Sequence, residues 1–212
     1  MEEKEYRLIY KEGSGEVIEK KSRFISDVFI VETEEQAQGY IAAIKKKHWD
    51  ARHSCFAYAI GERCELQRCS DDGEPQGTAG KPILEVIMGN NLHNCLIVVT
   101  RYFGGTLLGT GGLVRAYQSS AKEGILACTL ARKIDGRRIV IETDYNGLGR
   151  IQYLAEQENI TIEDIQYTDK VTITVVASNI KADDFINKVT EATSAKAVFL
   201  ENVSTDIILP II

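Results

Sequence analysis

The pattern of apolar and polar residues is clearest in the last third of the chain, where it predicts strands and helices in alternation. Strands are predicted over residues 138–145, 160–167, 171–177 and 196–205. Between them, apolar residues three and four positions apart predict two helices, one capped by Asn146 and one opened by Ser178 or Asn179. The resulting order, βαββαβ, is that of a ferredoxin-like domain.

The first part of the chain has a different mixture of elements. Strands are predicted over residues 7–10, 16–20, 24–31, 54–60, 65–70 and 96–102. The last of these is a continuous apolar run, which indicates a central strand covered on both faces. A capping box formed by Thr33 and Gln36 predicts one helix. Pro82 predicts a short second helix, and Gly111-Gly112 lead into a long third one. The sequence therefore predicts an α+β protein with two domains, residues 1–134 and 135–212.

Charge is unequal between these two domains. The first contains 18 Lys and Arg against 18 Asp and Glu, and the second contains 7 against 13, so the whole net charge of −6 lies on the second. An acidic domain repels a polyanion, so any contact with nucleic acid is expected in the first domain. The overall acidity makes DNA an unlikely partner.

Composition limits the possible locations of the protein. No window approaches eighteen consecutive apolar residues, and the charged N-terminus lacks the apolar core of a signal peptide. These features predict a cytoplasmic protein without membrane contact. The five cysteines contain no C-x-x-C pair, which favours buried thiols over a structural zinc site.

One candidate for chemistry is the loop that follows the predicted strand over 65–70. Asp71, Asp72 and Glu74 place three carboxylates within four residues, and Thr78 follows them. Three interpretations stay open: a turn with solvated charges, a loop that faces a ligand or RNA, or a site for Mg²⁺ or Ca²⁺. The spacing is not that of an EF-hand, so we favour the turn and expect no bound metal.

A second candidate is the glycine-rich segment after the apolar strand. Gly104 and Gly105 open a loop whose backbone N–H groups are able to contact a phosphate. Arg101 and Arg115 flank this loop and are candidates to bind phosphate, and Tyr102 is a candidate to stack on a base. The segment lacks the Walker and dinucleotide-binding patterns. The alternative is that its glycines serve only tight turning and close packing.

A third candidate is His53, at the start of a predicted strand. A histidine near carboxylates suits acid–base chemistry, but no nucleophile motif accompanies it. We therefore expect His53 to hydrogen-bond a loop carboxylate.

The three candidates lie in segments that resemble the signature of the IMPACT family, whose bacterial members are the YigZ-type proteins. These segments are residues 53–58 (HSCFAY), 71–82 and 100–117 (TRYFGGTLLGTGGLVRAY), in the family's order. The resemblance covers about residues 16–130, and residues 137–205 resemble the bacterial members' C-terminal domain. It implies an N-terminal α/β sandwich like ribosomal proteins and domain IV of elongation factor G. The C-terminal domain would then be similar to domain V of that factor.

The resemblance also implies a link to translation, because eukaryotic members regulate translation under amino-acid stress by binding a partner protein. Our leading hypothesis is a translation-linked regulatory protein that contacts RNA, the ribosome or a ribosome-associated partner through its first domain. The predicted binding residues are His53, Asp71, Asp72, Glu74, Thr78, Arg101, Tyr102, Gly104, Gly105 and Arg115.

Two alternatives are kept beside this hypothesis. One is a phosphate-handling or hydrolytic enzyme that uses His53, Asp71, Glu74 and Arg101. The other is a protein–protein adaptor without RNA contact. We favour a protein that is not an enzyme and has no cofactor, and the sequence leaves the oligomeric state open.

Overall fold

The structure, a computed structural model, describes residues 5–211 and divides the chain into two compact units, residues 6–132 and 133–209. Each unit has its own apolar core, and a five-stranded sheet lies entirely within the first unit. Five helices and eleven strands occur in the described part of the chain. An α+β fold in two parts is therefore confirmed.

The N-terminal unit contains most of the strands. These are β1 (Glu5–Lys11), β2 (Gly13–Glu19), β3 (Ser22–Ile30), β4 (His53–Ile60), β5 (Leu66–Ser70), β6 (Leu92–His93) and β7 (Cys95–Tyr102). Five of them form an antiparallel sheet in the order β2-β3-β7-β4-β5, while β1 and β6 pair in parallel. The apolar run 96–102 does form the central strand of this sheet.

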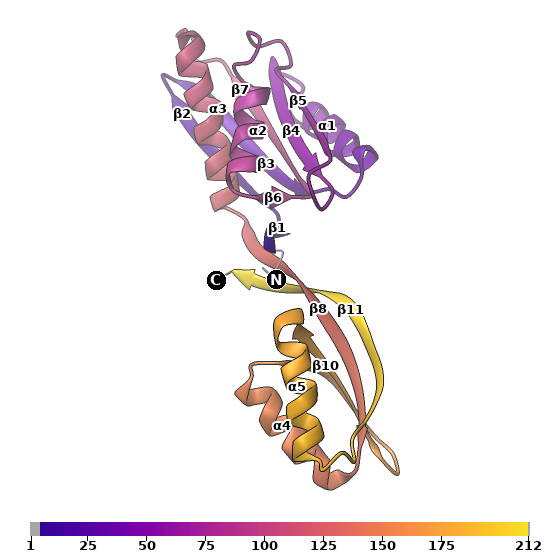
Figure 1. Cartoon of the computed structure of the whole chain (residues 1–212). Helices are drawn as coiled ribbons and strands as arrows, with labels where there is room; N and C mark the ends of the chain where they lie inside the picture. The colour runs from indigo at the N-terminus through magenta and orange to yellow at the C-terminus, as the bar shows by residue number, and fades with distance from the viewer. Residues whose placement is uncertain (1–4, 212) are drawn as a thin grey trace. The chain divides into compact units, whose positions relative to one another are not determined.

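Helices cover both faces of the five-stranded sheet (Figure 1). They are α1 (Glu34–Lys47) on one face, and α2 (Gly80–Gly89) and α3 (Gly109–Leu126) on the other. Strand β7 serves both cores, since Ile97 and Val99 pack with α2 and α3, whereas Leu96 and Val98 pack with α1. This alternation explains why β7 has no polar face.

Two helix starts show how local sequence decides local structure. Thr33 caps α1 by accepting a hydrogen bond from the N–H of Gln36, as the capping box predicts. The side chain of Gln36 reaches back to the N–H of Glu32. In contrast, α3 begins at Gly109, so Gly111 and Gly112 belong to its first turn rather than to the loop before it.

The C-terminal unit has the predicted order βαββαβ. Its elements are β8 (Thr129–Thr143), α4 (Tyr145–Gln157), β9 (Thr161–Tyr167), β10 (Val171–Ser178), α5 (Asn179–Ala192) and β11 (Val198–Ile211). The strand order is β9-β10-β8-β11, and β10 pairs antiparallel with both β8 and β9. Both helices pack on the sheet through one apolar core. The ferredoxin-like arrangement is thereby confirmed.

Two details of this unit differ from the sequence prediction. Helix α4 is capped by Asp144, whose carboxylate accepts a hydrogen bond from the N–H of Gly147 at 2.7 Å, and not by Asn146. Asp144 is the better acceptor at this position because its side chain is charged beside the positive end of the helix. Strand β8 also begins at Thr129, well before residue 138, so the point at which the units divide lies within a strand.

Candidate functional site

A pocket of about 420 Å³ opens in the N-terminal unit beside the first turn of α3. Its charged and polar side chains are Arg52, His53, Glu74, Arg101 and Thr110. Its apolar lining comes from Pro75, Phe103, Leu107, Leu108 and Leu113. Each of the three sequence segments singled out above contributes to this lining, because His53 starts β4, Glu74 lies in the loop after β5, and Arg101 lies near the end of β7.

Arg101 and Glu74, which both line the pocket, form a buried ion pair. The Nη1 atom of Arg101 lies 2.7 Å from Oε1 of Glu74, and both side chains are more than nine-tenths buried. The guanidinium lies over the rings of Phe24 and Phe103, at 5.4 and 5.5 Å from their centroids. A planar cation held between two rings and a carboxylate has little freedom to move. Arg101 is therefore a fixed part of the site.

Glu74 has a second partner on the side of the core. The hydroxyl of Tyr117 in α3 donates to Oε1 of Glu74 at 2.8 Å, and the Sγ atom of Cys55 lies 3.3 Å from that hydroxyl. Burial raises the pKa of the Cys55 thiol to about 12 and also raises the pKa of Tyr117 above its usual range. Cys55 is consequently a protonated thiol at neutral pH, which is the unreactive form.

Asp71 organises the loop between β5 and α2. Its Oδ1 accepts hydrogen bonds from the N–H groups of Ala79 and Gly80 at 3.0 and 2.9 Å, and its Oδ2 accepts one from Gly77 at 2.7 Å. Burial by itself raises the pKa of Asp71, but these three N–H donors outweigh it and hold the pKa below its ordinary value. Asp71 thus stabilises the start of α2 and does not line the pocket.

His53 and Asp72 join this loop to β4. The Nδ1 atom of His53 lies 2.9 Å from the backbone carbonyl oxygen of Asp72, so His53 donates to a carbonyl and not, as expected, to a loop carboxylate. The carboxylate of Asp72 is already used, because it accepts from the N–H of Ser54 at 2.7 Å and from Nζ of Lys45 at 2.6 Å.

The three loop carboxylates therefore have separate partners. Asp71 binds backbone N–H groups, Asp72 binds Lys45 and Ser54, and Glu74 binds Arg101 and Tyr117. Within residues 5–211, no group of three His, Cys, Asp or Glu side chains is placed to hold a metal ion. Thr78 also serves the loop itself, since its hydroxyl donates to the carbonyl oxygen of Pro75 at 2.7 Å.

The glycine-rich segment packs on the β2–β3 turn. A Cβ atom on Gly104 would lie 2.0 Å from the carbonyl carbon of Lys21, and the N–H of Gly104 donates to Oγ of Ser22 at 3.1 Å. No other residue permits this approach of two backbones. Gly105 is exposed with a φ of 82°, in the left-handed region that glycine adopts readily.

Of the ten predicted site residues only His53, Glu74 and Arg101 line the pocket, and Tyr102 and Arg115 are among those outside it. The hydroxyl of Tyr102 lies 3.0 Å from a carboxylate oxygen of Asp50 and 3.0 Å from Nδ1 of His48, and the guanidinium of Arg23 lies over its ring. Arg115 is exposed on α3 and does not line the pocket.

Conversely, the structure brings in residues that were not among the predicted site residues. Beside Arg52, these are Pro75, Phe103, Leu107, Leu108, Thr110 and Leu113. Pro75, Phe103, Leu107 and Leu108 lie in loops and have no periodic signal, because loop residues do not repeat at a strand or helix spacing.

The hydrogen bonds of Asp71 predict a pH-dependent contribution to stability. Asp71→Asn removes the acceptor for the Gly77 N–H and is expected to lower the free energy of unfolding at pH 7 by about 1–3 kcal/mol. Because the folded-state pKa of Asp71 is depressed, its stabilisation is present above the unfolded value near 3.8 and is lost as pH falls through the folded value. Urea unfolding of both proteins between neutral and acidic pH should show the difference shrinking below that unfolded value.

Asp169→Asn is the control for this experiment. Asp169 lies exposed in the turn between β9 and β10, so its replacement should change stability by no more than about 0.5 kcal/mol. A penalty for Asp71→Asn that stays constant down to acidic pH would contradict the assignment.

Comparison with known proteins identifies relatives for both units. The model of the Impact N-terminal domain matches residues 20–125, and that of a domain of unknown function, DUF1949, matches residues 141–196. The IMPACT family member YvyE of Bacillus subtilis is 39% identical over 91% of this chain and 88% of its own length. The IMPACT family member YigZ of Escherichia coli is 36% identical over 81% of this chain and 85% of its own length.

A solved structure supports the same assignment. The crystal structure of a hypothetical protein superposes with a TM-score of 0.60 at 32% identity, over 94% of this chain and 98% of that one. Within the residues that the structure describes, no helix is long and apolar enough to cross a membrane.

Proposed function

The chain belongs to the IMPACT family, and from that premise we propose that it is a translation-linked regulatory protein whose N-terminal unit binds single-stranded RNA, free or on the ribosome. The link to translation rests on the family resemblance, which implies translational control for the eukaryotic members. The assignment of RNA rests on the surface formed by the β2–β3 turn and the residues around Tyr102.

The observation that carries the proposal is the conformation of the β2–β3 turn. Lys20 and Lys21 are the two residues between the paired positions Glu19 and Ser22, and their φ angles are 46° and 68°. Two positive φ values are those of a type I′ turn, in which Asn-Gly is the favoured pair. A left-handed conformation costs a residue such as lysine about 1–2 kcal/mol. Two cations are therefore kept at the tip at a conformational cost.

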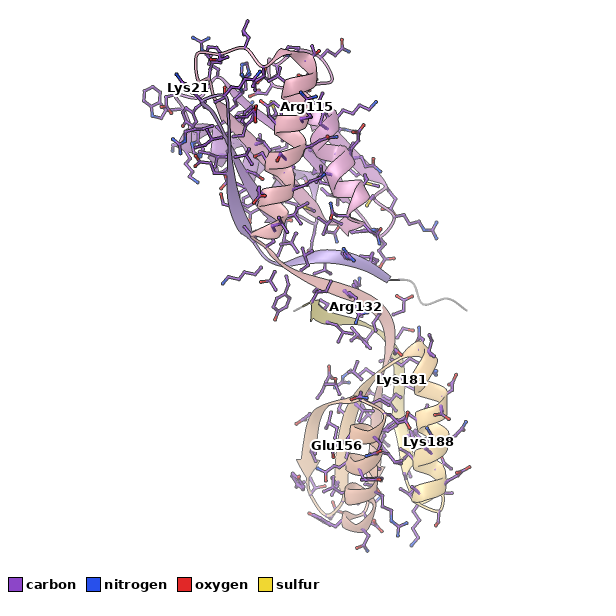
Figure 2. The ribbon with its side chains drawn as sticks, turned by 90° about the vertical axis from the view of Figure 1, so that its left-hand side faces the viewer. Lys21, Arg115, Arg132, Glu156, Lys181 and Lys188 are labelled. Carbon is purple, nitrogen blue, oxygen red and sulfur yellow. The ribbon has the colours of Figure 1, made fainter. Side chains whose placement is uncertain are left out.

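The ring next to this basic edge is that of Tyr102, which is half-buried and lies opposite Arg23 in the β3–β7 pairing. Trp49 is 82% exposed and directly precedes Asp50, the hydrogen-bond partner of Tyr102. Arg23 continues the basic edge from the turn and lies over the ring of Tyr102, 5.8 Å from its centroid. Figure 2 shows Lys21 at the tip of this unit and Arg115 on α3 near the same end. Cations that bind phosphates beside rings that stack on bases are the usual means of binding single strands.

Replacing the turn tests this proposal without damaging the fold. Lys20→Asn/Lys21→Gly supplies the pair that suits the turn, so the free energy of unfolding should stay equal or rise. Affinity for a fluorescein-labelled single-stranded RNA should fall about tenfold, and the slope of log affinity against log salt should fall by about 1.4 for two lost phosphate contacts. Fluorescence anisotropy between about 50 and 200 mM salt measures both quantities.

The matched control removes two lysines from the acidic C-terminal unit. Lys181→Asn/Lys196→Asn changes the net charge by the same amount and should leave both the RNA affinity and the salt slope unchanged. An equal loss of RNA affinity in the two double variants would show that RNA binding depends only on net charge. RNA binding that is undetectable at low salt, with a protein partner still captured from ribosomes after nuclease treatment, would replace the proposal with a protein adaptor.

A further inference from the structure

The pocket beside α3 is lined by both cationic and apolar side chains. We propose that it binds a single nucleoside monophosphate unit, with the phosphate at the first turn of α3 and the base against the apolar wall. This unit occurs both as a free nucleotide and as the 5′-phosphorylated end of an RNA. Only the second source rests on the function proposed above.

In this proposal the phosphate contacts the start of α3 and Arg52, which both line the pocket. The N-cap residue Leu108 has no side-chain hydrogen bond to the helix, so the N–H groups of the first turn have no side-chain acceptor. Gly109 and Thr110, in that turn, line the pocket. A helix of 18 residues directs N–H donors and a partial positive charge at this point, which favours an anion.

Arg101 gives a second and independent indication of a ligand. Its side chain lines the pocket and is only 6% exposed, yet its Nε N–H has no hydrogen-bond partner in the described structure. Its Nη1 is held by Glu74, and its Nη2 lies 3.5 Å from Oγ of Ser22. A buried N–H without a partner is costly in an apolar site, so Arg101, a lining residue, retains an unused donor.

The apolar lining residues suit a flat ring. Leu107 is 83% exposed and Phe103 is 47% exposed, although both line a pocket that Pro75 and Leu113 also line. The volume of about 420 Å³ lies within the range of small-molecule sites and suits a single nucleotide. Burial of Leu107 and Phe103 against a base would remove apolar surface from water.

The charge of the lining favours a monophosphate. Arg52 and Arg101 carry two positive charges, and Glu74 carries one negative charge at the same pocket. Together with the helix end, this leaves an excess of between one and two positive charges. Such an excess matches one phosphate group better than the larger negative charge of a triphosphate chain.

The test uses the full chain and adenosine 5′-monophosphate as the probe. Thr110→Asp adds a negative charge at a position where it favours the helix, so the variant should fold while repelling phosphate. Isothermal titration calorimetry should show binding of the monophosphate weakened at least about tenfold by Thr110→Asp and within about threefold of wild type for Thr110→Asn. Adenosine without phosphate should bind more weakly than the monophosphate, and Leu107→Ser should weaken both.

A second arm distinguishes the two sources of the ligand. A short RNA with a 5′-phosphate that binds more tightly than the same RNA with a 5′-hydroxyl, and loses that advantage in Thr110→Asp, identifies an RNA end. Equal binding of the two RNAs, with the free monophosphate still bound, identifies a free nucleotide. Both results support the pocket.

Failure of this inference is separate from failure of the proposed function. Lys20→Asn/Lys21→Gly should weaken binding of the 5′-hydroxyl RNA. It should leave binding of the free monophosphate unaffected, because those lysines do not line the pocket. Absence of RNA binding with the monophosphate still bound would remove the proposed function alone. The inference is overturned if the monophosphate shows no heat of binding at about 5 mM, or if Thr110→Asp binds it as wild type does.

Discussion

Arg101→Met is expected to lower the free energy of unfolding by about 3–5 kcal/mol. The reason is that Glu74 would stay buried as a carboxylate with only the hydroxyl of Tyr117 as a partner. The loss of the guanidinium would also remove its contacts with the rings of Phe24 and Phe103. Urea unfolding at pH 7, followed by circular dichroism, measures the change.

The double variant Arg101→Met/Glu74→Gln is the control for this result. It removes both charges, and the glutamine still offers an oxygen to Tyr117. Removal of a whole buried ion pair is often close to neutral, so the double variant should be more stable than Arg101→Met alone. The ion pair would not stabilise the fold as described if Arg101→Met lowered the free energy of unfolding by less than about 1 kcal/mol. The same would follow if the effects of Arg101→Met and Glu74→Gln on that free energy simply summed to the effect of the double variant.

Phe185→Ala is expected to have a similarly large effect in the C-terminal unit. Phe185 in α5 is 0% exposed and belongs to the core that α4 and α5 form with the sheet. Truncation of a buried phenylalanine to alanine costs about 3–5 kcal/mol through lost burial and the cavity that remains. Hydrogen exchange with mass spectrometry should show the loss of protection in β8, β10 and α5.

The same experiment tests the proposed division into domains 1–134 and 135–212. The cores of the N-terminal unit contain no residue of the C-terminal core, so amides in β3 and β7 should keep their protection in Phe185→Ala. Tyr153→Ala is the matched control, because Tyr153 is an aromatic residue on α4 with 61% of its surface exposed. An equal loss of protection in β3 and β7 would show that the chain unfolds as one cooperative unit.

Regular elements with strong patterns were predictable from the sequence. The βαββαβ order and the central position of 96–102 followed from periodicity, which reports directly how many faces of an element are buried. Ends of elements were less predictable, as Gly109 and Asp144 show. Glycine at the start of a helix and two neighbouring cap candidates each allow more than one local solution, so packing decides between them.

The sequence by itself determined which residue types were available to a site: a histidine, a loop of carboxylates and an arginine beside a glycine-rich loop. It also determined that residues 1–134, which carry no net charge, precede an acidic segment, residues 135–212. These properties are local or additive along the chain, so no fold is needed to read them.

Only the tertiary structure decided how those residues are used. It joins His53, Glu74 and Arg101 at one pocket, directs Asp71 to the start of α2, and places Lys20 and Lys21 in left-handed conformations beside Gly104. The physical reason is that a hydrogen bond or an ion pair depends on distances of about 3 Å between residues far apart in the chain, and only strand pairing and helix packing set such distances.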